Sequence, residues 1–249
     1  MFRVWYRNFK VWLKHLQASL IGNLGQPFLF LLAFGFGLGK SVPEIEGMSY
    51  LQFIAPRLVA SAVMYSAAFE ATYGSYTRLS TQGTFEAILI TPITIFELAL
   101  GEILWGATKG LVAGLIMLAT LPLFGVVPST WALLMIPLLF VEGIIFSAFG
   151  LIMTAIATNY DFFNYFTSLV ITPLFLFSGI FFSLKAVAPA LRNVLMLLPL
   201  SNIVDLSRML CYGRFNQTMP IELELLIILG FTLLSSWLAV ILLKRRMIQ

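Results

Sequence analysis

Long apolar stretches dominate the sequence and limit what the chain can fold into. Six of them reach the roughly 20 mostly apolar residues that a helix needs to cross about 30 Å of hydrocarbon. They cover about residues 19–39, 52–73, 101–124, 131–157, 163–183 and 222–243. We therefore predict an all-α integral membrane protein with six transmembrane helices, in which residues 1–249 form a single domain.

The scarcity of charge excludes the main alternatives. Only 10% of the 249 residues are charged and 60% are hydrophobic, whereas about 25% of the residues in an average soluble domain are charged. A soluble protein of this size needs a more polar surface to avoid association. A soluble enzyme, a nucleic-acid binder and a disordered tail are excluded. The net charge of +4 suits contact with anionic lipid head groups.

The N-terminal residues have a different pattern. Four basic residues are spaced 4, 3 and 4 apart, so a helix would align them on one face: Arg3, Arg7, Lys10 and Lys14. The other face is apolar and largely aromatic, with Phe2, Trp5, Phe9, Trp12, Leu13 and Leu16. This pattern predicts a helix over residues 1–18 that lies flat in the head-group layer, and a soluble amphipathic helix is the alternative.

Basic residues near the ends of the spans predict the orientation. They gather in the N-terminal helix and in the tail at residues 244–246, and an even number of spans puts both termini on one side. We therefore expect both termini in the cytoplasm. Four basic residues oppose this prediction because it places them outside: Lys185, Arg192, Arg208 and Arg214.

Nothing in the sequence resembles a catalytic site. The segment from Gly35 to Ser41 is similar to a phosphate-binding loop, but it has three residues between its outer glycines where that motif has four. The single histidine, His15, belongs to the N-terminal helix. We predict no catalytic residue and no metal site, and any ATP that powers the protein must bind to another chain.

The third apolar stretch contains Gly106, Gly110 and Gly114 at intervals of four. Small residues at this spacing let helix backbones approach closely in lipid. The pattern therefore predicts that this helix lies inside a bundle.

Two charges are expected deep in the membrane. Lys109 and Glu142 fall on the third and fourth spans, which a short turn joins, at an offset of about 6 Å along the helices. They are long enough to meet, so a structural ion pair is one interpretation and a polar site in a substrate path is the other. Arg57 and Glu70 lie nearer the ends of the second span, where we expect them to snorkel to the membrane surface.

Tyr65, Phe69 and Tyr73 are spaced four apart and form an aromatic stripe on the second span. Sugar rings stack on such faces, which suggests a glycan path, while helix packing or an interface belt is the ordinary explanation. The candidate substrate path therefore comprises these three residues with Lys109 and Glu142.

A short segment between the second and third spans has an apolar face of its own. Phe85, Ile88 and Leu89 share one side of a helix that Pro92 would end. Such a face can lie on lipid or dock into a groove of a partner, and the sequence leaves both open.

At this point the residues suggest a family. The chain resembles the permease subunits of type V, or ABC-2, exporters over essentially its whole length. The likeness is strongest in residues 172–182 and in residues 198–208, which end in Arg208, and Ser183 stands where the family commonly has proline. Residues 50–56 and 83–92 look like the subgroup that contains the nodulation J protein, an exporter of lipo-oligosaccharide.

The resemblance implies an interfacial helix, six spans, and a cytoplasmic coupling helix. It also implies short re-entrant helices on the outer side between spans five and six, at residues 185–209. Two permeases would pair as a homodimer in the bacterial inner membrane above two separate ATPase chains, which carry the ATP and Mg. The residues that would couple to the ATPase are Thr84, Phe85, Glu86, Ile88, Leu89 and Pro92.

The function expected from this resemblance is the permease subunit of an ATP-driven exporter of a glycolipid, lipo-oligosaccharide or polysaccharide. A permease for drugs or small hydrophobic molecules is the alternative within transport. A membrane scaffold without transport is the alternative from another class.

Overall fold

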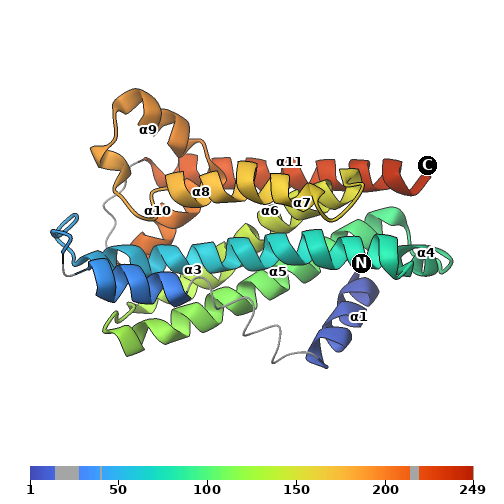
Figure 1. Cartoon of the computed structure of the whole chain (residues 1–249), viewed down its shortest axis with the longest axis horizontal. Helices are drawn as coiled ribbons and strands as arrows, with labels where there is room; N and C mark the ends of the chain where they lie inside the picture. The colour runs from blue at the N-terminus through green and yellow to red at the C-terminus, as the bar shows by residue number, and fades with distance from the viewer. Residues whose placement is uncertain (15–27, 40, 214–218, 249) are drawn as a thin grey trace.

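The computed structural model describes residues 1–14, 28–39, 41–213 and 219–248 (Figure 1). The structure is 81% helix and contains no strand among the described residues, which confirms the all-α prediction.

The helices follow one another with few long connections. The first part of the chain contains α1 (Phe2–Leu13), η1 (Leu31–Leu38), α3 (Tyr50–Phe69), η2 (Glu70–Gly74), η3 (Thr77–Thr81), α4 (Thr84–Leu89), α5 (Ile95–Thr120) and η4 (Leu121–Phe124). The second part contains η5 (Thr130–Leu134), α6 (Met135–Ile156), α7 (Phe162–Phe166), η6 (Thr167–Ile171), α8 (Thr172–Phe177), η7 (Leu184–Ala186), α9 (Pro189–Met196), α10 (Pro199–Tyr212) and α11 (Ile221–Ile248).

Four helices in the described part of the chain are long and apolar enough to cross a membrane. They are Tyr50–Thr81, Ile95–Phe124, Thr130–Ile156 and Ile221–Ile248, and they correspond to the predicted spans two, three, four and six. Residues 19–27 of the predicted first span, 19–39, lie outside the described residues, and residues 28–38 are helical. The count of six spans therefore remains a prediction.

The predicted fifth span, 163–183, contains a shorter apolar helix, Phe162–Phe177. This helix ends at Ser178, and Gly179 has a φ of +79°, a left-handed conformation that commonly ends helices and favours glycine. The helix therefore ends before the predicted boundary at about 183, because apolar residues continue beyond Gly179 in the sequence although the helix does not.

The segment between the fifth and sixth spans forms a bent pair of helices. α9 and α10 meet at 89°, and Pro199 begins the second of them. Proline has no N–H to continue a helix, and it disfavours helical geometry in the residue before it, which explains the bend. A bent pair is the form expected of a re-entrant segment, and its depth in the membrane remains a prediction.

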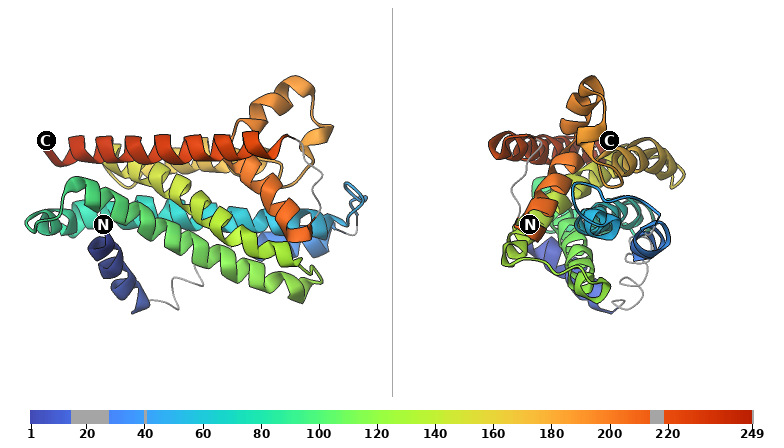
Figure 2. Two further views of the ribbon diagram at one scale, coloured as in Figure 1. Left: turned by 180° about the vertical axis from the view of Figure 1, so that it is seen from behind. Right: turned by 90° about the vertical axis from the view of Figure 1, so that its left-hand side faces the viewer.

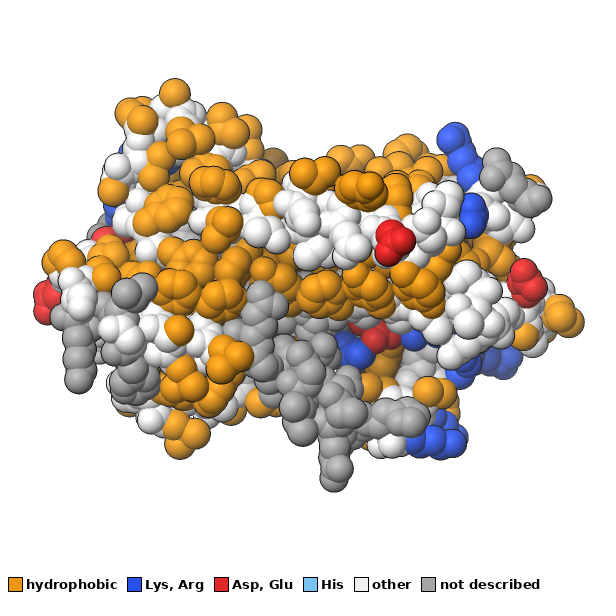
Figure 3. Space-filling view, viewed as in Figure 1, with side chains coloured by type: hydrophobic (Ala, Val, Ile, Leu, Met, Phe, Trp, Pro, Cys, Tyr) orange, Lys and Arg blue, Asp and Glu red, His pale blue; other side chains and the backbone are white. Residues whose placement is uncertain are grey.

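The two chain termini and α4 lie at one end of the bundle, which we call the terminal end (Figures 1 and 2). The bent pair and the loop before α3 lie at the other end, which we call the distal end. Hydrophobic side chains cover most of the face shown in Figure 3, and Lys and Arg gather towards the terminal end. Which side of the membrane each end faces remains a prediction.

α3 lies at the centre of the bundle, and nearly all of its residues from Phe53 to Ala68 are buried. It packs against α5, where glycines provide the space: a Cβ on Gly114 would lie 2.5 Å from Val63 Cγ2 and a Cβ on Gly110 would lie 3.1 Å from Ala67 Cβ. The packing role predicted for the glycines of the third span is confirmed.

A second apolar core forms at the terminal end. Phe85 of α4 is fully buried there, in one cluster with Val4 of α1, Leu98 of α5, Leu151 of α6 and Leu243 of α11. The short helix α4 therefore packs into the core of the bundle, with Ile88 and Leu89 against the same cluster.

Candidate functional site

Four charged side chains form a network that we call the terminal-end cluster: Glu70, Arg78, Glu102 and Lys109. Arg78 Nη1 lies 2.9 Å from Glu70 Oε1 and Arg78 Nη2 lies 2.7 Å from Glu102 Oε2. Lys109 Nζ lies 2.7 Å from Glu70 Oε2, and no side chain of the four is more than 13% exposed. Two acids balance two bases, which is the form in which a protein interior tolerates charge.

The path of α3 brings this cluster together. The helix continues through the π-helical turns η2 and η3, and this puts Glu70 and Arg78 on a common side. Gly74 lies between them, and a Cβ there would lie 2.7 Å from Glu70 Oε1, so a larger residue would displace the Glu70 carboxylate. On α5, Glu102 and Lys109 are seven residues apart, which is about two turns.

Neutral side chains complete the bonding of the two acids. Ser75 Oγ and Asn8 Nδ2 donate to Glu102 at 2.8 and 2.7 Å, and Trp105 Nε1 donates to Glu70 at 2.8 Å. Asn8 belongs to α1, so the cluster ties the N-terminal helix to the bundle.

A second bond from α1 reaches α4. Arg7 donates to the side chain of Asn8 at 3.0 Å and, at 3.5 Å, to Thr84 at the start of α4. The cluster therefore lies within one polar network that includes α1, α3, α4 and α5.

The predicted contact between Lys109 and Glu142 is wrong, because Lys109 pairs with Glu70. A Cβ on Gly143 of α6 would lie 2.8 Å from Ala107 Cα, so these two residues mark the contact between the helices. Lys109 is two residues from Ala107, about 200° round α5, so the two side chains leave the helix on different sides. Glu70 lies inside the cluster, so the prediction that it snorkels to the surface is also wrong.

Glu142 is fully buried, and neither of its carboxylate oxygens has a hydrogen-bond partner among the described residues. An unpartnered charge at this depth is costly, and such residues commonly have a function. Its place in a substrate path remains a prediction.

The aromatic stripe lies against the short helix Phe162–Phe177. The rings of Tyr65 and Phe175 meet edge to face at 5.4 Å, and those of Tyr73 and Phe163 do so at 5.1 Å. Phe69 lies between them, 5.8 Å from Tyr65 and 5.9 Å from Tyr73. The stripe packs helices together in this structure, and a role in substrate passage remains a prediction.

A further charged group, the distal-end cluster, comprises Glu46, Arg57, Asp205 and Arg208. Arg208 forms ion pairs with Glu46 and, at 2.7 Å, with Asp205. Arg57 is buried and does not snorkel as expected: its guanidinium carbon lies 3.3 Å from the centre of the Phe53 ring, and its Nε and Nη1 have no hydrogen-bond partner within the described residues. Guanidinium groups are attracted to aromatic faces.

Glu46 joins the loop before α3 to the bent pair. Partial burial alone would raise the pKa of Glu46, but a hydrogen bond from Ser183 and the charge of Arg208 hold that pKa below its ordinary value. The sequence singled out Arg208 as a basic residue on the outer side and as part of a family pattern, but it held no signal for the partner Glu46, which is 162 residues away.

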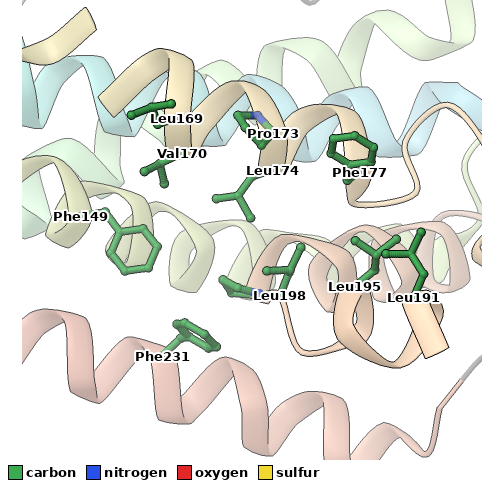
Figure 4. A pocket seen from close by; sticks show the side chains of 11 residues that line it. Phe149, Leu169, Val170, Pro173, Leu174, Phe177, Leu191, Leu195, Leu198 and Phe231 are labelled. Atoms are coloured by element: carbon green, nitrogen blue, oxygen red, sulfur yellow. The ribbon is translucent and has the colours of Figure 1, made fainter. Parts of the chain in front are cut away.

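Two of the cavities in the structure bear on the function. One of about 490 Å³ is entirely apolar, and Figure 4 shows its side chains converging from α6, the helix Phe162–Phe177, the bent pair and α11. The other, of about 250 Å³, lies beside the terminal-end cluster beneath α1.

Comparison with known proteins places this fold in a family. The family model described as "ABC-2 type transporter" matches residues 1–212. Nodulation protein J of Rhizobium meliloti is 34% identical over 98% of this chain and 92% of its own length, and that of Neorhizobium galegae is 35% identical over 99% and 93%. The chain belongs to the ABC-2 transporter family.

A more distant relative has the same general character. The inner membrane transport permease YadH of Escherichia coli is 26% identical over 80% of this chain and 76% of its own length. This ABC-2 protein is therefore an integral membrane component of a transporter, of a family that normally works with ABC ATPase subunits.

The six residues assigned to ATPase coupling in this ABC-2 permease differ in exposure. Glu86 and Pro92 are exposed, Thr84, Ile88 and Leu89 are half-buried, and Phe85 is buried. The sequence missed Ile90, which is 89% exposed directly after α4. The sequence did show an apolar residue, Ile90, directly after the apolar face formed by Phe85, Ile88 and Leu89, and this could have indicated a contact residue.

Proposed function

We propose that this ABC-2 permease is the membrane subunit of an ATP-driven exporter that moves a glycolipid, lipo-oligosaccharide or polysaccharide across the bacterial inner membrane. The observation that carries the proposal is its similarity to nodulation protein J, which extends over nearly the whole chain in several organisms. The lipo-oligosaccharide substrate follows from the resemblance to that subgroup.

In this proposal the terminal end is cytoplasmic and α4 receives the force of ATP hydrolysis. Glu86 and Ile90 are exposed for contact with a partner, while Phe85 holds the same helix in the core. Because Phe85 packs in one cluster with residues of α5 and α6, a push on α4 would reach the spans directly. The partners are two ATPase chains, which bind ATP and Mg, and a second copy of the permease; the chain itself needs no cofactor.

Replacement of Ile90 tests this coupling. We expect Ile90→Asp to reduce substrate-stimulated ATP hydrolysis and transport at least tenfold in the assembled complex, since a central interface anchor contributes about 2 kcal/mol or more. Leu123→Asp is the matched control, because Leu123 is 83% exposed and lies in η4, past the end of α5 that is remote from α4. Unchanged stimulation and transport in Ile90→Asp would remove the coupling role from α4.

Export of a small hydrophobic molecule is the second candidate, and the apolar cavity in Figure 4 favours it. A strain that lacks the permease separates the two. We expect this strain to lose export of a labelled glycolipid and to keep efflux of a hydrophobic dye. Loss of dye efflux with unchanged glycolipid export would favour the second candidate.

A further inference from the structure

The cavity of about 250 Å³ beneath α1 has a lining that the coupling role does not explain. It lies between α1, the end of α3 and its π-helical turns, and α5. In Figure 3 charged side chains of both signs lie in the recess between α1 and the body of the bundle. Ligand pockets for drug-sized molecules begin at about 300 Å³, so this space suits a single ring and not a long chain.

Two indole rings form its apolar walls. Trp12 of α1 and Trp105 of α5 both line the cavity, and their rings meet edge to face with centroids 5.9 Å apart. Flat aromatic faces of this kind accept the C–H face of a saturated ring. Their presence beside charged groups favours a ligand that is apolar on one side and polar on the other.

The polar part of the lining consists of planar groups that can form hydrogen bonds with hydroxyls. Glu70 offers carboxylate oxygens, Asn8 and Gln82 offer amides, and Arg7 offers a guanidinium. A sugar hydroxyl both donates and accepts, so it bonds to all three kinds of group.

The charge balance favours a neutral ligand. The terminal-end cluster beside the cavity contains two acids and two bases that already pair with each other. A phosphate would be attracted by Arg7 and Arg78 but repelled by Glu70, and it would have to displace the hydrogen bonds that both guanidinium groups already make. A neutral ring with several hydroxyls meets no such penalty.

We propose that this cavity binds the sugar head group of a glycolipid, with the lipid tail in the adjacent bilayer, before the substrate is moved. This inference rests on the proposed function, which supplies a glycolipid at the terminal end. It assigns α1 a part in substrate selection, because that helix contributes Arg7, Asn8 and Trp12 to the lining.

Two probes that share an octyl tail and differ in head group test which head group the cavity binds. Octyl glucoside and octyl phosphocholine are added, below the concentrations at which they form micelles, to the assembled complex in lipid nanodiscs, and their Kd values are measured by calorimetry. We expect the glucoside to bind more tightly than the phosphocholine and more tightly than free glucose. Equal affinity for both octyl probes, or for free glucose and the glucoside, would overturn the proposal.

Three variants locate the site. We expect Trp12→Leu to raise the Kd of the glucoside about tenfold, the loss of one stacking contact of typical strength, and to leave the phosphocholine unchanged. Gln82→Ala should raise the glucoside Kd about threefold through loss of one hydrogen bond. Because Gln82 is exposed, this second variant serves even if Trp12→Leu does not fold. Trp237→Leu is the control, since Trp237 is 62% exposed on α11 and outside the lining.

Transport assays keep this inference separate from the proposed function. If the complex exports a glycolipid with the same KM in wild type, Trp12→Leu and Gln82→Ala, the sugar site is wrong and the proposed function stands. If the glucoside binds as expected but the complex exports no glycolipid, the proposed function is wrong and the sugar site stands.

Discussion

Two charged clusters lie at opposite ends of this protein and are built differently. In the terminal-end cluster every charge is paired, and neutral donors from Asn8, Ser75 and Trp105 add to the bonding. In the distal-end cluster, Arg208 bonds to two acids while Arg57 retains two donors without partners within the described residues. The first cluster joins α1 and two long helices, and the second joins a loop and a bent pair to α3.

This difference indicates how each end can move. To separate the extension of α3 from α5 at the terminal end, several buried ion pairs must break at once, and the hydrogen bond from Asn8 to Glu102 ties α1 to them. At the distal end, the ion pair between Glu46 and Arg208 can open without disturbing a long helix. A rigid terminal end next to α4 suits the transmission of force.

Loss of one acid from the terminal-end cluster should have the largest effect. We expect Glu102→Ala to lower the free energy of unfolding by about 3–5 kcal/mol, because Arg78 and Lys109 are left with Glu70 as the one acid of the cluster, which therefore carries a net buried charge. Denaturation of the purified permease in detergent measures this. Glu97→Ala, at an exposed position on the same helix, is the control. An equal loss of stability in both variants would mean that the buried ion pair of Glu102 contributes no more than an exposed one.

Double-mutant cycles sharpen the pairing within the terminal-end cluster. We expect Lys109→Met and Glu70→Gln to be coupled by about 0.5–3 kcal/mol in the free energy of unfolding, as residues in direct contact are. Lys109→Met and Glu142→Gln should be additive within about 0.5 kcal/mol. Coupling between Lys109 and Glu142 without coupling between Lys109 and Glu70 would support the ion pair that the sequence suggested.

The distal-end cluster should give the smallest effect. We expect Glu46→Gln to cost less than about 1 kcal/mol in the free energy of unfolding, as partly exposed ion pairs do. Since the pKa of Glu46 is lowered in the folded protein, its contribution is present at neutral pH. It is lost as the pH falls from about 4.5, the ordinary pKa of the group, through the lower folded value.

Denaturation of the wild type and of Glu46→Gln at pH 7 and at pH 3 measures this contribution. The difference between the two proteins should shrink at the lower pH. A difference that grows on acidification would contradict the assigned ion pair.

The sequence predicted the parts of the fold that depend on local pattern. The apolar lengths gave four of the spans, and Gly106, Gly110 and Gly114 marked the face on which α5 packs. The prediction from sequence failed where a helix departs from regular α-helical geometry. Arg78 was placed in a connecting segment because the polar residues after 73 ended the apolar pattern, whereas the backbone continues as π-helical turns to Thr81.

The candidate site likewise has features that the sequence predicted and features that only the structure shows. Lys109 was correctly picked out as a charge among apolar residues, but its partner depends on how α5 is rotated against α3 and α6. The apolar face of residues 84–92 was visible in the sequence, but only the structure shows that Phe85 fills the core and Ile90 faces outward.

The sequence by itself determined that this is a helical membrane protein, because apolar length and residue spacing are properties of neighbouring residues. Its similarity to known permeases identified the ABC-2 family. The tertiary structure alone decided which charges pair, which aromatic rings pack and where the cavity beneath α1 forms. These features depend on the relative rotation and depth of helices, which the contacts of residues such as Ala107 and Gly143 fix across long stretches of chain.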